Sequence, residues 1–156
     1  MRCRVIVLLS ALTAAVALAA GCDGGATPTT STVVPPPASS GPEVVVRAWI
    51  DAVNAGDEPA GRALSTTAFA DADRAAEEAG WFANTLTIRD LEVGEAVPVR
   101  GLVSNRDYAQ VVAVPVVFLL EQKREISFRD GLVQWGFVLV RDGPGERWRI
   151  NEQGLG

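Results

Sequence analysis

Apolar residues recur with two different periods along this chain, and the change of period separates two kinds of element. Between residues 43 and 80 they return every three to four positions, which is the repeat of an amphipathic helix. From residue 86 onward they return at every second position or form longer runs, which is typical of strands. Helices followed by strands predict one α+β domain over residues 43–156.

The helical half divides into three predicted helices. The first begins at Pro42, which suits the first turn of a helix, and ends at Gly56, which suits a left-handed C-terminal position. A second is predicted at residues 58–64, and a third, capped by serine and threonine, at residues 65–79 with Gly80 ending it. The apolar stripe of the first helix consists of Val45, Trp49, Ala52 and Val53.

Acidic side chains gather on the third predicted helix: Asp71, Asp73, Glu77 and Glu78. They lack the spacing of a calcium-binding EF-hand loop, so we expect no metal there. Arg74 lies four residues before Glu78, the distance at which opposite charges pair on a helix. We therefore expect a solvated helix face with an Arg74–Glu78 ion pair.

The strand half begins with alternating apolar residues over 86–99, with a phase slip at residues 89–90, and residues 101–106 are predicted to form a connection. Residues 108–120 form a nearly continuous valine-rich run, which predicts a strand buried on both faces. Pro115 lies inside that run. The strand therefore requires a bulge or an unpaired edge segment at this proline.

Two further strands, at residues 132–141 and 146–153, close the chain. The sequence Asp-Gly-Pro-Gly at residues 142–145 joins them and predicts a hairpin. Arg147 and Arg149 point away from its apolar face. That face consists of Trp135, Phe137, Leu139, Trp148 and Ile150.

The start of the chain has the organisation of an export signal. Two arginines precede an apolar run over residues 5–20, shorter than the roughly 20 residues of a spanning helix, which predicts a signal peptide at residues 1–21. Cys22 follows an Ala-Gly pair directly, and this arrangement resembles the lipobox of bacterial lipoproteins. The resemblance implies a diacylglycerol on Cys22 and a location in the cell envelope, on the outer face of the cytoplasmic membrane. Plain secretion with Cys22 unmodified is the alternative.

Residues 22–42 are rich in Thr, Ser, Pro and Gly and hold few apolar side chains. Such a segment cannot bury enough surface to order itself, which predicts a flexible tether between membrane and domain. Its threonines and serines beside proline suit O-linked glycosylation, and an unmodified linker is the alternative.

The composition excludes several classes of chemistry. The chain contains no histidine, which removes Ser-His-Asp and Cys-His catalysis and the commonest zinc ligand. Once the leader is removed, Cys22 is the only cysteine, so no internal disulfide is expected. The formal net charge of −5 becomes −7 when the two arginines of the leader are lost, which argues against nucleic-acid binding. We expect neither a metal nor a cofactor.

Two stretches carry a family resemblance: residues 47–57, RAWIDAVNAGD, and residues 135–150, WGFVLVRDGPGERWRI. They resemble the nuclear transport factor 2-like superfamily, also called the cystatin-like or ketosteroid isomerase-like cone, as it occurs in actinobacterial lipoproteins. The resemblance covers residues 43–156. It implies a curved antiparallel sheet wrapped around the N-terminal helices, with a cone mouth that can hold a ligand. The superfamily includes isomerases, dehydratases and non-catalytic adaptors, so it does not settle function.

The candidate pocket residues are all aromatic: Trp49, Trp81, Phe82, Tyr108 and Trp135. Tryptophans at inward positions pack in cores more often than they line pockets. Trp81 and Phe82 directly follow a glycine at a helix exit. They are expected to close the cone mouth, to form a contact patch, or to pack internally.

No combination of residues meets the needs of a recognised catalytic mechanism. We therefore expect a membrane-anchored, non-catalytic domain that binds a protein partner or a small apolar ligand; a homodimer through the outer sheet face is compatible with this. The alternative is an isomerase-like or dehydratase-like pocket enzyme in which an aspartate acts with Tyr108. Asp51, Asp57 and Asp90 are the carboxylates near the expected cone, whereas Asp107 neighbours Tyr108 and points to the opposite face.

Overall fold

The computed structural model of the chain describes residues 32–100, 105, 107–126 and 129–154. The predicted signal peptide, Cys22 and the first part of the predicted tether lie outside these residues, as does most of the predicted connection at 101–106. None of the helices in the described ranges has the length and apolar composition needed to cross a membrane.

Helices occupy the first half of the domain, as predicted. They are α1 (Pro42–Ala55), α2 (Glu58–Ala63), α3 (Thr67–Ala75), the 3-10 helix η1 (Glu77–Ala79) and α4 (Trp81–Asn84). Pro42 lies in the first turn of α1, and Gly56 caps its end at φ 64°, so the predicted limits of this helix are confirmed.

The third predicted helix is shorter than expected. It ends at Ala75, and Glu77 adopts a left-handed φ of 49°, which breaks the helical path. Gly80 does not act as a left-handed cap, because its φ is −66°. It is needed for a close approach instead, since a Cβ there would lie 2.5 Å from the carbonyl oxygen of Asp73.

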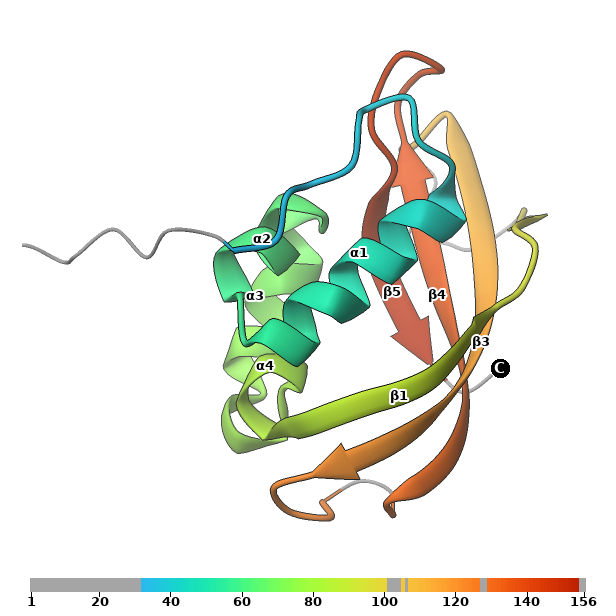
Figure 1. The fold of residues 1–156 in the computed structure, drawn as a ribbon. Coiled ribbons are helices and arrows are strands. Elements are labelled where there is room, and N and C mark those ends of the chain that lie inside the picture. Colours follow the sequence, from blue (N-terminus) through green and yellow to red (C-terminus); the bar gives the residue numbers. More distant parts are fainter. Residues whose placement is uncertain (1–31, 101–104, 106, 127–128, 155–156) are drawn as a thin grey trace, which may run out of the picture.

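Five strands form one antiparallel sheet in the order β1-β3-β4-β5, with β2 also paired to β3. They are β1 (Thr85–Val93), β2 (Val97–Pro98), β3 (Gln110–Gln122), β4 (Gly131–Arg141) and β5 (Arg149–Gly154). Figure 1 shows the sheet bending around α1, with α2, α3 and α4 beside it on the same face. The architecture is therefore α+β, with helices followed by a curved antiparallel sheet.

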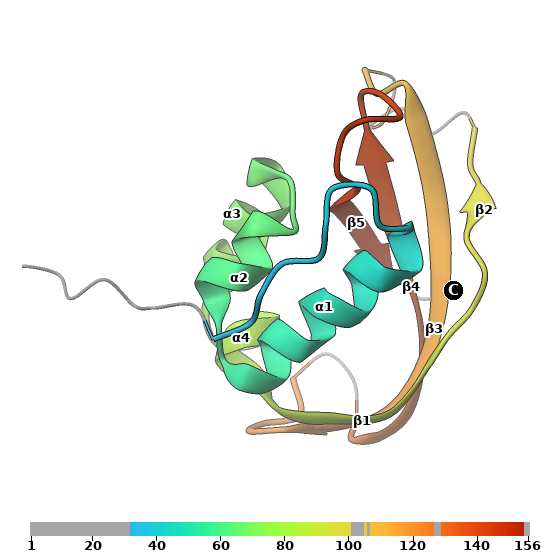
Figure 2. The same cartoon turned by 45° about the horizontal axis from the view of Figure 1, so that its top comes forward.

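Two irregularities predicted for the strands are confirmed. The register of β1 shifts between Arg89 and Glu92, where Asp90 adopts a φ of 51°. Pro115 lies opposite the break between β1 and β2, and its carbonyl accepts a hydrogen bond from the Gly94 N–H at 2.8 Å. The N–H and C=O groups of one residue point to the same side of a strand. A backbone N–H at position 115 would therefore face this break, and proline, which lacks that N–H, is tolerated there. Figure 2 shows β2 alongside β3 beyond the end of β1.

The prediction that the long valine-rich strand is buried on both faces is wrong. One face of β3 is fully buried: Val114, Val116, Phe118 and Leu120. The side chains between them are half-buried, and Pro115 is exposed. The reason is architectural, because the helices cover only the concave face of the sheet (Figure 1).

The C-terminal hairpin forms as predicted, with Leu139 opposite Ile150. Its second strand begins at Arg149, three residues later than expected. The inward side chains pack in the core: Phe137, Leu139, Trp148 and Ile150 are buried, and Trp135 is half-buried. Arg149 lies 3.4 Å from Asp142, across the turn.

The predicted Arg74–Glu78 ion pair does not form, because each residue pairs with a different partner. Arg74 Nη2 lies 2.5 Å from Glu58 Oε1, and Glu78 pairs with Arg124. The helix ends between Arg74 and Glu78, so the four-residue spacing no longer brings them together. Asp73 is half-buried and does not belong to a solvated face.

The end of the predicted tether lies against the domain. Residues 32–41, here called the strap, run from α2 past the β4–β5 turn to the start of α1 (Figure 1). Asp57 Oδ2 accepts the Thr32 and Val33 N–H groups at 2.5 and 3.0 Å, and Arg147 Nη2 donates to the Pro36 carbonyl at 3.0 Å. This segment is held by polar groups of the domain, which its own composition does not reveal.

Candidate functional site

An aromatic cluster occupies the concave face of the sheet. Trp49, at the middle of α1, is 1% exposed. Rings meet it edge-on with centroids 5.3 to 6.0 Å away: Phe69, Trp81, Phe82 and Phe137. Such edge-to-face contacts are favourable beyond the area they bury. The centre of the concave face is therefore filled by side chains.

The structure brings four of the five candidate pocket residues together as packing partners. The ring centroids of Trp81 and Trp135 lie 5.8 Å apart, and Trp81 also contacts Trp49. Trp81 is buried, and Phe82 is half-buried above Gly61, where a Cβ would lie 2.1 Å from the Phe82 ring. Of the alternatives for this pair, internal packing is the one that the burial of the two side chains supports.

An open recess lies beside this cluster. It is bordered by α3 and α4, by the start of β1 and by the end of β3. We call it the acidic recess; it measures about 560 Å³, and its wall includes Asp73, Trp81, Trp135 and Glu152. Trp81 and Trp135 thus form one of its sides while their rings pack against each other. Free space therefore remains at this end of the curved sheet, although the centre of its concave face is filled by side chains.

Asp73 accepts a backbone hydrogen bond at the edge of that recess. Its Oδ1 accepts the Trp81 N–H at 2.8 Å, at the start of α4. Burial raises the pKa of the Asp73 carboxyl above its ordinary value, whereas hydrogen bonds from the Trp81 and Phe82 backbones act in the opposite direction. The sequence pattern assigned Asp73 to a solvated face. The available signal was Gly80, whose missing side chain allows the approach.

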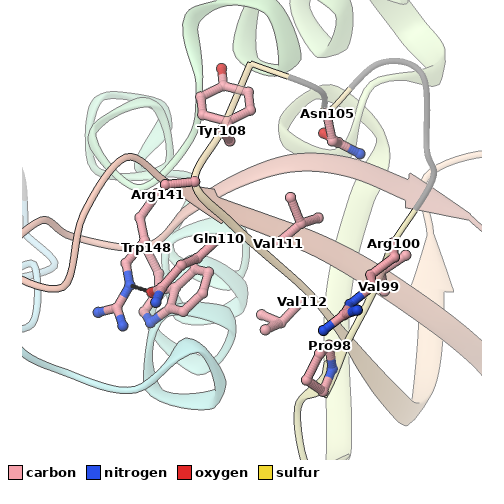
Figure 3. Close-up of a pocket in the computed structure, with 11 residues that line it drawn as sticks. Pro98, Val99, Arg100, Asn105, Tyr108, Gln110, Val111, Val112, Arg141 and Trp148 are labelled. Carbon is pink, nitrogen blue, oxygen red and sulfur yellow. Dashed lines mark hydrogen bonds between the residues drawn. The ribbon is translucent and has the colours of Figure 1, made fainter.

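A second recess lies at the opposite end of β3, where β4 ends and β2 leaves the sheet edge. We call it the arginine recess; it measures about 570 Å³. Its wall combines Arg100, Arg141, Trp148 and Tyr108 with proline and valine side chains (Figure 3). None of the described residues that line it is acidic.

Arg141 is held firmly in the arginine recess. Its guanidinium carbon lies 4.4 Å from the centre of the Trp148 ring, a cation–π geometry. Its Nε donates to Gln110 Oε1 at 2.5 Å, and its Nη1 lies 3.4 Å from the Pro144 carbonyl. The stacking and the hydrogen bonds fix the plane of the guanidinium group.

The aspartate–Tyr108 pair that the alternative enzyme hypothesis requires is not formed among the described residues. Tyr108 lines the arginine recess, where no described lining residue is acidic, and its hydroxyl points away from Trp148 and Gln110 in Figure 3. Asp57 is instead buried as the N-cap of α2, and Asp51 and Asp90 are exposed. The side chains that the enzyme alternative requires are therefore dispersed.

No group of three metal-binding side chains occurs among the described residues. Comparison of the chain with protein-family models and with curated proteins finds no match. The class of protein is therefore defined by its architecture: helices followed by a curved antiparallel sheet of five strands, compatible with a cone-like α+β fold.

Proposed function

We propose that this chain is a cell-envelope lipoprotein whose single domain is a non-catalytic binding module. In this proposal residues 1–21 are removed as a signal peptide, and Cys22 carries a diacylglycerol. The domain then stands on the outer face of the cytoplasmic membrane. Its fold is that of the nuclear transport factor 2-like superfamily, which the curved sheet around α1 supports.

The observation that carries the non-catalytic assignment is the filled concave face. A pocket enzyme of this architecture needs a cavity where the substrate meets a buried acid or base. In this chain Trp49 and the rings around it occupy the middle of that space. Two recesses lie at the two ends of the sheet, where ligands can bind without entering the core.

The strap supports a location close to the membrane. If Cys22 is acylated, residues 23–31 alone connect it to the strap, and a chain of nine residues reaches at most roughly 30 Å. Each buried methylene of a lipid chain contributes about 0.8 kcal/mol, so two chains hold the protein firmly on the bilayer. The domain would therefore work near the membrane surface.

Membrane fractionation of two cysteine variants tests the anchor. The Cys22→Ala variant is expected to leave the membrane fraction or to accumulate unprocessed. Cys3→Ala removes the other cysteine of the chain, lies in the leader, and is expected to fractionate like the wild type. Equal membrane association of the Cys22→Ala variant and the wild type, with normal processing, would contradict the anchor.

A second candidate function rests on Asp73. Its carboxyl group borders the acidic recess, and burial raises its pKa, as a general base requires. An isomerase-like or dehydratase-like enzyme would use it to remove a proton beside a carbonyl group. Deuterium exchange into cyclohex-2-enone in D₂O, followed by NMR, tests this. Catalysed exchange that is lost in Asp73→Asn would support the enzyme, and exchange at the uncatalysed rate would contradict it.

A further inference from the structure

We propose that the arginine recess binds a small organic anion, whose carboxylate or phosphate contacts Arg100 and Arg141 and whose apolar body lies on the recess wall. This inference rests on the proposed function of the domain as a binding module. It names the chemical class of the ligand and the place where it binds.

The first argument is the charge of the recess. The chain is acidic overall, and several of its arginines pair with carboxylates on the surface, as Arg62 does with Asp71 and Arg89 with Glu121. Neither Arg100 nor Arg141 pairs with a carboxylate of the described residues, although both line one recess. An anion would supply the missing opposite charge, whereas a cation would be repelled.

The second argument is the geometry of Arg141. A guanidinium group has five N–H donors, and the contacts to Gln110 and Pro144 use two of them. The other three have no partner among the described residues. The Trp148 ring and Gln110 already hold the group in place, so little conformational entropy is lost when an anion binds.

The third argument is the position of the second charge. Arg100 is exposed and approaches the recess beside Pro98, on the side opposite Arg141 and Trp148 (Figure 3). An anion between the two arginines would accept charge-assisted hydrogen bonds from both sides, and these bonds are about twice as strong as neutral ones. Arg100 makes no hydrogen bond to the described residues, so it can move to meet the ligand.

The apolar part of the wall favours an anion that carries a hydrocarbon group over an inorganic ion. Val112 lies between Arg100 and Trp148, Pro98 lies beside Arg100, and both present hydrocarbon to the recess (Figure 3). At about 570 Å³, the space fits a ligand larger than phosphate alone. A carboxylate or phosphate on a flat or branched hydrocarbon body satisfies both parts of the wall.

Calorimetry on the full-length chain in phosphatidylcholine nanodiscs tests this inference. The probes are naphthalene-2-carboxylate and 2-naphthyl phosphate, with naphthalene-2-carboxamide as a neutral control of the same shape. We expect at least one anion to bind about tenfold or more tightly than the amide, in line with the strength of charge-assisted pairs. The relative affinities of the two anions show which head group the site prefers.

Substitutions locate the binding. Arg100→Gln and Arg141→Gln are each expected to weaken anion binding at least about fivefold, a change typical of one charge-assisted hydrogen bond. Arg89→Gln changes an arginine outside the recess and is expected to bind like the wild type. Since Arg141 also packs on Trp148, the exposed Arg100 provides the variant with the least risk of misfolding.

Three results would overturn the inference: no binding of either anion, equal affinity for anion and amide, or equal weakening by Arg89→Gln and Arg100→Gln. Binding in the recess does not require the lipid on Cys22, so a chain that is not acylated is measured in buffer without nanodiscs. The Cys22→Ala variant is expected to keep the same affinity, so a failure of the anchor and a failure of the binding site are distinguished.

Discussion

The backbone N–H of Val33 donates to Asp57 Oδ2 at 3.0 Å, across 24 positions of sequence. The other oxygen of the same carboxylate accepts the Ala60 N–H, also at 3.0 Å, and begins α2. One buried side chain therefore caps a helix and holds the strap on the domain. The segment that would lead to the membrane is thereby coupled to the fold.

Asp57→Ala is expected to destabilise the start of α2 and to release the strap from the domain. Loss of a helix N-cap costs about 0.5–2 kcal/mol of unfolding free energy, and the strap N–H groups lose their acceptor as well. Urea unfolding should show this loss, and limited proteolysis should cut near residues 32–36 faster than in the wild type. Asp51→Ala, on the exposed side of α1, is the matched control. Equal behaviour of the two variants would contradict the role of Asp57.

Trp49→Ala is expected to be among the most destabilising substitutions in the chain. It empties the centre of the aromatic cluster, and removal of a buried aromatic ring costs about 3–5 kcal/mol. Urea unfolding measures the change. Leu132→Ala removes an apolar side chain that is 70% exposed and should change stability by less than about 0.5 kcal/mol. A loss below about 1 kcal/mol for Trp49→Ala would mean that the concave face is not tightly packed.

Gly61→Ala tests the contact between α2 and the cluster. The added Cβ would lie 2.1 Å from Phe82 Cζ, so the ring must move. Overpacking of this kind typically costs about 1–3 kcal/mol. Thermal unfolding should detect the loss, with Gly145→Ala as control, because a Cβ at Gly145 meets nothing within 4 Å. Unchanged stability of Gly61→Ala would show that Phe82 is free to leave its position.

Asp73→Asn is expected to change how stability depends on pH. Burial raises the pKa of Asp73 in the folded state, so the folded state binds this proton more tightly than the unfolded state does. The resulting stabilisation is complete below the unfolded pKa, about 3.9, and is lost as pH rises through the folded pKa. The Asp73→Asn variant lacks this pH-dependent contribution to the free energy of unfolding.

Unfolding free energies of wild type and Asp73→Asn should therefore be compared from about pH 4 upward. The wild type is expected to lose stability relative to the variant as pH rises over this window. Asp51→Asn serves as the exposed control. A constant difference between wild type and Asp73→Asn at every pH would contradict the buried environment of this carboxyl.

Local signals predicted much of the fold. Gly56 marks the end of α1 because a left-handed cap favours glycine, and the slip at Arg89 and Asp90 marks the register shift in β1. Pro115 predicted an interruption of pairing because proline lacks a backbone donor. Each of these features depends on the chain within a few residues of itself.

The failures concern contacts between distant residues. The strap is held by Asp57 and Arg147, which no property of residues 32–41 reveals. Asp73 joins the acidic recess because Glu77 turns the chain. One face of β3 is covered because the helices in the described part of the chain pack on one side of the sheet (Figure 1). The arginine recess escaped prediction for the same reason, since Arg100 and Arg141 are 41 positions apart. Tertiary geometry decides all of these.

The intact mass of the protein extracted from membranes tests the central proposal most directly. The proposal predicts a mature chain that begins at Cys22 and carries the mass of a diacylglycerol. Fragmentation should place that mass on the first residue. A chain that begins at another residue, or an unmodified Cys22 in the membrane-extracted protein, would contradict the proposal that this domain is a lipid-anchored module of the cell envelope.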